Sequence, residues 1–169
     1  MPKHSAGILL YRRAASGGGT EVLIVHPGGP FWAKKDLGAW SIPKGEFDPA
    51  AEEPLAAAKR EFQEEMGAPA PPGAYEPLAE AKQSSGKIVH AFVLASDFNL
   101  ERFHSNMFEM EWPPRSGTKQ EFPECDRAAW VPLKTARQKL VKGQAGFIDT
   151  LAEKLGEDLG APPVQASLF

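Results

Sequence analysis

The chain has 169 residues, of which 42% are hydrophobic and 24% charged, a balance that suits one globular domain with a buried core. Its net charge of -3, with lysines and arginines scattered along the chain, argues against a polymeric nucleic-acid partner. The single cysteine, Cys125, excludes an internal disulfide, and no apolar run approaches the length that crosses a membrane. These properties predict a cytoplasmic protein with no membrane association.

Two apolar, β-rich runs open the chain, at residues 5–12 and 21–26, and a glycine-rich turn at 16–20 joins them. This pattern predicts a β-hairpin. The glycines could instead form a phosphate loop, but neither a Lys-Ser/Thr pair nor a helix start follows them. The hairpin is therefore the preferred interpretation.

The clearest helix pattern covers residues 54–66. Apolar residues recur along it at helical spacing and predict a buried stripe: Leu55, Ala58, Phe62 and Met66. Pro54 suits the first position of a helix, and Gly67 suits a C-terminal cap. We therefore expect a helix from Pro54 to Met66.

The second half of the chain repeats the same classes of pattern. A turn at 84–86 separates two predicted strands, at 75–83 and 87–95. A short strand is expected at 128–131, near Trp130, and two helical patterns follow it, at 133–141 and 144–155. The stretch 103–122 predicts irregular structure. This order indicates the α+β class, an α/β/α sandwich with a mixed β-sheet. No linker divides the chain, which predicts one domain over residues 1–157 and a C-terminal tail over 158–169.

Three carboxylates, Glu61, Glu64 and Glu65, lie at positions i, i+3 and i+4 of the predicted helix and share one face. Like charges at this spacing weaken a helix, whereas a hard divalent cation would remove the repulsion and use the oxygens as ligands. The alternative is a solvated acidic face that binds no metal.

The stretch from Gly45 to Ala68 resembles the Nudix box, G-x5-E-x7-R-E-U-x-E-E-x-G-U, in which U is a bulky aliphatic residue. The second half of the box matches at Arg60, Glu61, Phe62, Glu64, Glu65 and Gly67, and Glu52 precedes Arg60 by eight residues. Six residues rather than five separate Gly45 from Glu52, so the loop is one residue longer than in the box. Phe62 and Ala68 replace the usual aliphatic residues.

The resemblance implies a Nudix-type sandwich and the hydrolysis of a nucleoside diphosphate linked to another group X, with Mg²⁺ or Mn²⁺ as cofactor. It implies that the metal ligands are Glu61, Glu64 and Glu65, helped by the backbone of Gly45. Arg60 and Glu52 resemble the pair that orients helix and loop. Glu64 is the first candidate for general base, and Glu61 and a glutamate outside the box remain alternatives.

The glutamate outside the box is predicted to be Glu124, six residues before Trp130. Nudix hydrolases that cleave diadenosine tetraphosphate look similar here, with a glutamate shortly before a tryptophan. Glu124 is equally interpretable as a surface turn residue, and Glu121 is the fallback. Cys125 and the four histidines show no nucleophile or metal-ligand spacing, so we expect structural roles for them.

Three basic residues are candidates for substrate contact. Lys44 belongs to a Pro-Lys-Gly sequence that resembles the entry to the box in diadenosine polyphosphate and diphosphoinositol polyphosphate hydrolases. Arg115 and Lys119 lie in an aromatic, Met-rich insertion at 103–119, whose aromatics could stack on a base but which we expect to pack as a lid. Each of these charges could also be a solvated loop residue.

The substrate is less well specified than the reaction. A dinucleoside polyphosphate is the first hypothesis, although Ser85 stands where many of those hydrolases carry a tyrosine. Gln83 stands where ADP-ribose hydrolases carry a proline. Nucleoside triphosphates, ADP-ribose and diphosphoinositol phosphates are alternatives, as is a non-catalytic nucleotide-binding module. Retention of all three box glutamates favours the enzyme. The oligomeric state, monomer or homodimer, is not specified by the sequence.

Overall fold

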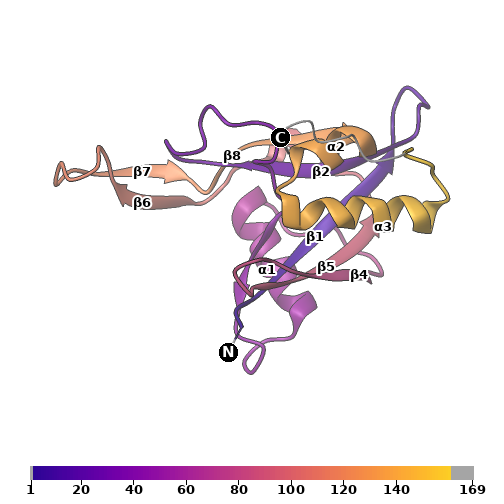
Figure 1. Ribbon diagram of the computed structural model, residues 1–169, viewed down its shortest axis with the longest axis horizontal. Helices are drawn as coiled ribbons and strands as arrows, with labels where there is room; N and C mark the ends of the chain where they lie inside the picture. The colour runs from indigo at the N-terminus through magenta and orange to yellow at the C-terminus, as the bar shows by residue number, and fades with distance from the viewer. Residues whose placement is uncertain (1, 161–169) are drawn as a thin grey trace.

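The computed structural model describes residues 2–160, and its centre is a six-stranded mixed sheet (Figure 1). Five strands follow the order β4–β5–β1–β2–β8, and β3 pairs with β1 beside this path. The elements, in chain order, are β1 (His4–Arg13), β2 (Thr20–Pro27), β3 (Lys44–Phe47), α1 (Pro54–Met66), β4 (Glu76–Lys82), β5 (Ile88–Ala95), β6 (Met107–Glu111), β7 (Lys119–Pro123), β8 (Cys125–Pro132), α2 (Leu133–Lys139) and α3 (Ala145–Leu155). Short 3₁₀ turns lie at Leu100–Arg102 and Lys142–Gln144.

Strand β1 organises the sheet because it pairs with three others. It pairs in parallel with β5 over residues 4–11, its last three residues pair with β2, and its first four pair with β3. Ile8 and Leu10 join the core on one face of the sheet, and Leu9 joins the core on the other. A strand covered on both faces needs apolar residues at consecutive positions, which explains the unbroken run in its sequence.

Helix α1 covers one face of the sheet, and α2 and α3 cover the other (Figure 1). The α1 side is built from Phe62 and Met66 against β1, whereas Phe147, Ile148 and Leu151 of α3 pack on the opposite side. The α+β fold with a mixed sheet is therefore confirmed. Both predicted hairpins and the three main helices are also confirmed, with the bounds of α1 as expected.

Within α1, the buried stripe differs from the prediction at one position. Ala57 is fully buried, whereas Leu55 is only half-buried. Residues 161–169 of the predicted tail lie outside the described residues. None of the helices in residues 2–160 combines the length and apolar content that crossing a membrane requires.

The prediction of irregular structure over 103–122 is wrong. Strands β6 and β7 form a separate two-stranded hairpin, here called the arm, which projects from the body (Figure 1). Glu109 pairs with Glu121 on one face of the arm, and Phe108 pairs with Phe122 on the other. Charged and aromatic residues thus lie on opposite faces of the arm, which is the two-residue period of a strand. In the sequence this period was obscured by the flanking prolines and by the methionines between the charged residues.

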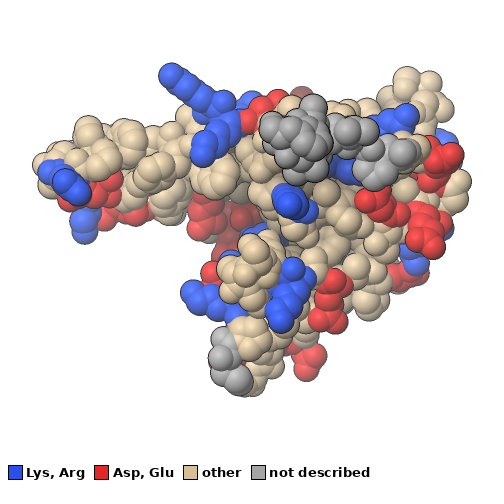
Figure 2. Space-filling model, viewed as in Figure 1, with Lys and Arg blue, Asp and Glu red and all other residues tan. Residues whose placement is uncertain are grey.

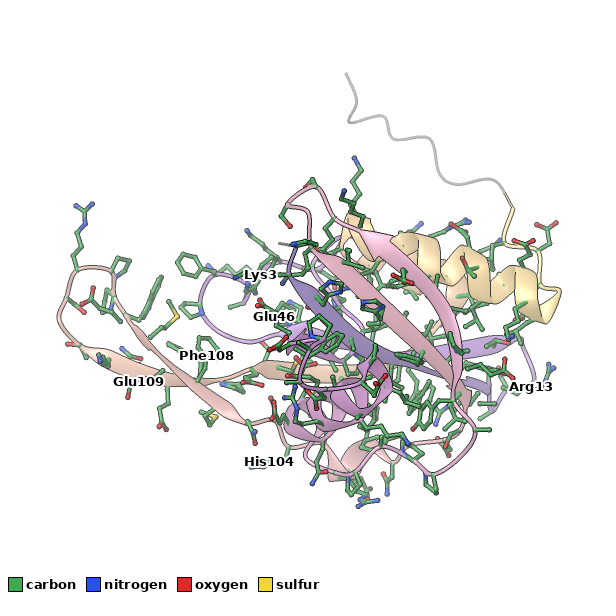
Figure 3. All side chains as sticks on the ribbon, turned by 90° about the horizontal axis from the view of Figure 1, so that it is seen from below. Lys3, Arg13, Glu46, His104, Phe108 and Glu109 are labelled. Atoms are coloured by element: carbon green, nitrogen blue, oxygen red, sulfur yellow. The ribbon has the colours of Figure 1, made fainter. Side chains whose placement is uncertain are left out.

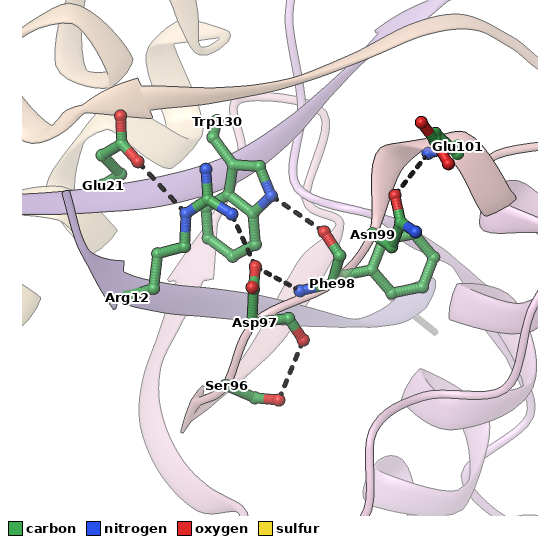
Figure 4. A network of polar contacts seen from close by, with 8 residues as sticks. All are labelled: Arg12, Glu21, Ser96, Asp97, Phe98, Asn99, Glu101 and Trp130. Atoms are coloured by element: carbon green, nitrogen blue, oxygen red, sulfur yellow. Dashed lines mark hydrogen bonds and ion pairs between the residues drawn. The ribbon is translucent and has the colours of Figure 1, made fainter. Parts of the chain in front are cut away.

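A polar network ties the sheet to the segment that follows β5 (Figure 4). Arg12 of β1 pairs with Glu21 and Asp97, and its guanidinium lies 4.1 Å from the centre of the Trp130 ring. The Trp130 indole N–H donates to the carbonyl of Phe98 at 3.1 Å. Because Phe98 packs edge-on against Phe62, with ring centroids 5.4 Å apart, the network supports α1 from beneath.

Candidate active site

Strand β3 brings Gly45 against the acidic face of α1. A Cβ atom added at Gly45 would overlap the carboxylate of Glu61. Only a residue without a side chain lets the two approach this closely. The longer loop between Gly45 and Glu52 therefore does not separate the strand from the helix.

Arg60 holds the loop and the helix together. It donates two hydrogen bonds to the Glu52 carboxylate, at 3.0 and 2.9 Å, in the bidentate geometry that arginine favours. A third, at 2.8 Å, goes to Glu61, and a longer one, at 3.4 Å, goes to Glu64. The hydrogen bonds to Glu52, then those to Glu61, raise the pKa of Arg60 further above its ordinary value. This geometry fits an orienting role for the Arg60–Glu52 pair.

Glu65 faces inward toward β3, not out to solvent. Its carboxylate accepts the backbone N–H of Lys44 at 3.0 Å. Burial raises the pKa of Glu65 to about 8, even though that hydrogen bond favours the ionised form. Burial, and then the nearby carboxylates of Glu65 and Glu124, raises the pKa of the Cys125 thiol. Cys125 is thus a buried residue packed behind the acidic cluster, and its high pKa argues against a nucleophile.

Glu124 joins the cluster through backbone contacts that no side-chain pattern shows. The Asn106 N–H donates to the carbonyl of Glu64 at 3.0 Å, and the Glu124 N–H donates to the carbonyl of Asn106 at 2.8 Å. Gly67 caps α1 with φ 78° and lies so close to the carbonyl of His104 that a side chain there would overlap it. The segment 104–106 therefore aligns Glu124 with the end of α1.

Four carboxylates share one electrostatic environment. Burial and the charge of Glu64 raise the pKa of both Glu61 and Glu124, and Glu61 and Glu124 in turn contribute to the raised pKa of Glu65. Figure 2 shows acidic atoms in the recess between the arm and the part of the body that contains α1. Such mutual repulsion is the state that a bound cation would relieve.

Lys44 also lies at this recess. Burial and the charge of Lys87 lower its pKa, against the opposing effect of Glu65, Glu46 and Glu61. A pocket of about 410 Å³ opens beside the same helix, lined by Arg60, Gln63, Glu64, Gly67, His104 and Asn106. Figure 3 marks His104, one of these lining residues.

Arg115 and Lys119 lie elsewhere, on the arm. Arg115 occupies the turn between β6 and β7 with φ 61°, and its N–H donates to Glu111. Lys119 lies 3.7 Å from Glu109. Within residues 2–160, Arg115 is thus held to the arm by its backbone and Lys119 by its side chain, and their role in substrate contact stays a prediction.

The donor set suits a hard divalent cation, because it consists of carboxylate and backbone oxygens. Among residues 2–160, no three His, Cys, Asp or Glu side chains converge closely enough to hold a metal. Hydrogen bonds explain why the carboxylates do not converge: Arg60 donates to Glu61 and Glu64, and the Lys44 N–H donates to Glu65. The carboxylates are therefore grouped on neighbouring elements, with their oxygens held by these hydrogen bonds.

A family comparison decides the classification, because the model of the NUDIX domain matches residues 1–151. The chain belongs to the Nudix family. The predicted resemblance is confirmed, and with it the assignment to the Nudix hydrolases, the pyrophosphohydrolases of this family. No curated protein sequence matches the chain significantly.

Solved structures agree on the fold. The NUDIX domain of Shewanella oneidensis NrtR, solved with ADP ribose, has a TM-score of 0.61 and 16% identity over 92% of this chain and 89% of its own. A Caenorhabditis elegans Ap4A hydrolase in a binary complex has a TM-score of 0.57 and 20% identity, over 91% and 98%. The Nudix hydrolase RenU of Mycobacterium smegmatis has a TM-score of 0.56 and 21% identity, over 94% and 89%.

Proposed function

We propose that this Nudix hydrolase cleaves a pyrophosphate bond in a nucleoside diphosphate linked to a group X, with Mg²⁺ or Mn²⁺ as cofactor and dinucleoside polyphosphates as the first substrates to test. The observation that carries the proposal is the shared recess of Glu61, Glu64, Glu65 and Glu124. Their mutual repulsion and oxygen-only chemistry suit a divalent cation, and the backbone of Gly45 lies directly against the Glu61 carboxylate.

Glu61, Glu64 and Glu65, with the carbonyl of Gly45, are the residues proposed to hold the metal. When bound, a divalent cation supplies charge neutralisation for the phosphates and Lewis acidity at the bond that breaks. The acidic recess alone would repel a polyphosphate, so substrate binding depends on this neutralisation. Lys44 adds a positive charge at the same recess and is proposed to contact a phosphate.

Glu64 is the proposed general base. Its side chain is 39% exposed, and its hydrogen bonds within residues 2–160 are limited to the long contact with Arg60. Glu61 and Glu65 are more strongly engaged, at 2.8 Å with Arg60 and 3.0 Å with the Lys44 N–H. A carboxylate with few fixed partners can turn toward a water and accept its proton. Glu124 is the second candidate because it shares the field of Glu64.

The resemblance of the loop entering the box, together with the fold shared with an Ap4A hydrolase, supports starting from dinucleoside polyphosphates. The NrtR domain solved with ADP ribose supports including that ligand. Phosphate release should be measured with Mg²⁺ and with Mn²⁺ on both of these, on nucleoside triphosphates and on diphosphoinositol phosphates.

The decisive comparison is Glu64→Gln against Glu53→Gln. Glu53 precedes α1, is exposed and makes no side-chain cap, so its substitution controls for the loss of one negative charge. We expect Glu64→Gln to lower kcat at least 100-fold and Glu53→Gln to leave it unchanged. Nucleotide binding without turnover by the wild type would instead identify a non-catalytic binding module.

A further inference from the structure

The first part of the connection between β2 and β3, residues 28–38 and here called the loop, presents large aromatic side chains to solvent. Phe31 is 62% exposed and Trp32 is 36% exposed. Neighbouring Lys35 places its amine 5.1 Å from the centre of the Trp32 ring. Exposed aromatics in a group are uncommon on a monomer surface and usually mark a contact site.

Buried contacts fix the stem of this loop. His26 is fully buried, and its Nε2 donates to the carbonyl of Lys35 at 2.6 Å while its Nδ1 lies 2.8 Å from the Asp126 carboxylate. At the far end, Asp36 accepts the indole N–H of Trp40 at 2.7 Å and pairs with Lys139 at 2.8 Å. The exposed tip therefore projects from a rigid base, and the side chains at the tip need little ordering to bind a ligand.

The loop begins at the acidic recess. The Gly28 N–H donates to the carbonyl of Glu124 at 2.9 Å. A turn then brings the chain back, because the Trp32 N–H bonds to the carbonyl of Gly29 at 3.3 Å. One Cα–Cα step plus the span of such a turn places the Trp32 Cα within about 11 Å of the Gly28 Cα. Trp32 is thus within reach of a group attached to phosphates in the recess.

The arm packs against this loop at Phe31 and Gly29. The rings of Phe31 and Trp112 meet edge-to-face with centroids 5.6 Å apart. Phe108, at the base of the arm (Figure 3), packs against Gly29, where an added Cβ would lie 3.1 Å from its ring. Phe31 thus already has an aromatic partner on the arm, whereas Trp32, although less exposed, has no aromatic partner among residues 2–160 and is the ring assigned here to a ligand, with Lys34 and Lys35 close in sequence. An aromatic face beside two cations complements an anionic ligand that carries a planar ring.

We propose that Trp32 is a specificity-determining residue that stacks on the nucleobase of the substrate while its phosphates occupy the acidic recess. The inference rests on the proposed pyrophosphohydrolase function and names the part of the substrate that the loop recognises.

The test compares Trp32→Ala, Trp32→Phe and a control, Leu37→Ala. Leu37 lies on the same loop, is 70% exposed and is not aromatic. For each variant, KM for diadenosine tetraphosphate and the inhibition constant of inorganic tripolyphosphate, which has no base, are measured with Mg²⁺. We expect Trp32→Ala to raise the ratio of KM to inhibition constant about 5- to 150-fold. Trp32→Phe should bring the ratio most of the way back to the wild-type value, and Leu37→Ala should match the wild type.

The possible outcomes separate the two proposals. If the wild type hydrolyses no nucleotide in the substrate panel, the proposed function fails. If the wild type is active but Trp32→Ala leaves the ratio unchanged, the stacking role is wrong and the function stands. A third outcome is that sedimentation shows a concentration-dependent dimer for the wild type that Trp32→Ala loses, while the ratio stays unchanged. The aromatic tip would then contact a second copy of the chain, which would also overturn the inference.

Discussion

The close approach of Gly45 to Glu61 predicts an unusual outcome for Gly45→Ala. The φ angle of Gly45 lies outside the left-handed region, so alanine meets no backbone penalty there. In a strand, replacing glycine by alanine ordinarily stabilises by roughly 0.5–1 kcal/mol. At Gly45 the new methyl group overlaps the end of the Glu61 side chain, which must turn away and lose its 2.8 Å hydrogen bond to Arg60, and together these cost about 1–3 kcal/mol. We therefore expect a net loss of stability.

A double-mutant cycle isolates the cause. When Glu61 is alanine, the overlap disappears, and Gly45→Ala should then be neutral or stabilising. The coupling between the two substitutions is expected to be about 1–3 kcal/mol, the overlap cost alone, because the alanine preference is present in both backgrounds and cancels. The free energy of unfolding in urea, followed by tryptophan fluorescence, measures all four corners of the cycle.

A matched glycine provides the control. Gly146 lies in α3 with no atom within 4 Å of an added Cβ, so Gly146→Ala should stabilise by about 0.5–1 kcal/mol in any background. If Gly45→Ala were equally destabilising with and without the Glu61 carboxylate, the cause would lie elsewhere in β3. The argument that glycine is needed there for the approach of Glu61 would then be refuted.

Three further outcomes are expected. Arg60→Lys loses the bidentate contact with Glu52 and should raise the Mn²⁺ concentration needed for half-maximal rate about 10- to 100-fold. An unchanged Mn²⁺ concentration would contradict the orienting role. His26→Ala should destabilise by about 2–3 kcal/mol and speed tryptic cleavage at the two lysines of the loop it anchors, which mass spectrometry would detect; equal cleavage would show the loop is held by other contacts. Hydrogen bonding to Arg12 lowers the pKa of Asp97, so Asp97→Asn should lower Tm at pH 7. The difference should begin to shrink below about pH 4, the ordinary pKa of an aspartate, and disappear only below the depressed pKa of Asp97; a constant difference across pH would exclude the ion pair as its source.

The sequence predicted α1 well because several independent signals agree there. Proline at the start, glycine at the end and apolar residues at helical spacing all define the same segment. The resemblance to the Nudix box then assigned metal-binding roles to the carboxylates of this helix. The burial of Glu65 was not predictable in this way, because helical spacing alone put all three carboxylates on the outer face. Its inward position depends on the backbone N–H of Lys44, which only the pairing of β3 with β1 brings there.

The arm and the anchored loop were missed for a related reason. Phe108 and Phe122 form one row of the arm, but their pairing depends on a register between strands that a single strand pattern does not reveal. His26 contacts the carbonyl of Lys35 and the carboxylate of Asp126, partners that lie in different elements. Long-range contacts through backbone groups leave no residue pattern in the sequence, which is also why the positioning of Glu124 through Asn106 was not foreseen.

The pairing of β1 with β5 bears on how the protein forms during synthesis. Helix α1, with the whole acidic motif, leaves the ribosome before Ile88, which pairs with His4. Until β5 has emerged, β1 lacks its parallel neighbour, and Phe62 and Met66 have only a partial sheet on which to pack. Glu124 emerges later still. The nascent chain therefore carries a complete motif well before it has an assembled site, and co-translational folding should yield activity only after β8 has joined the sheet.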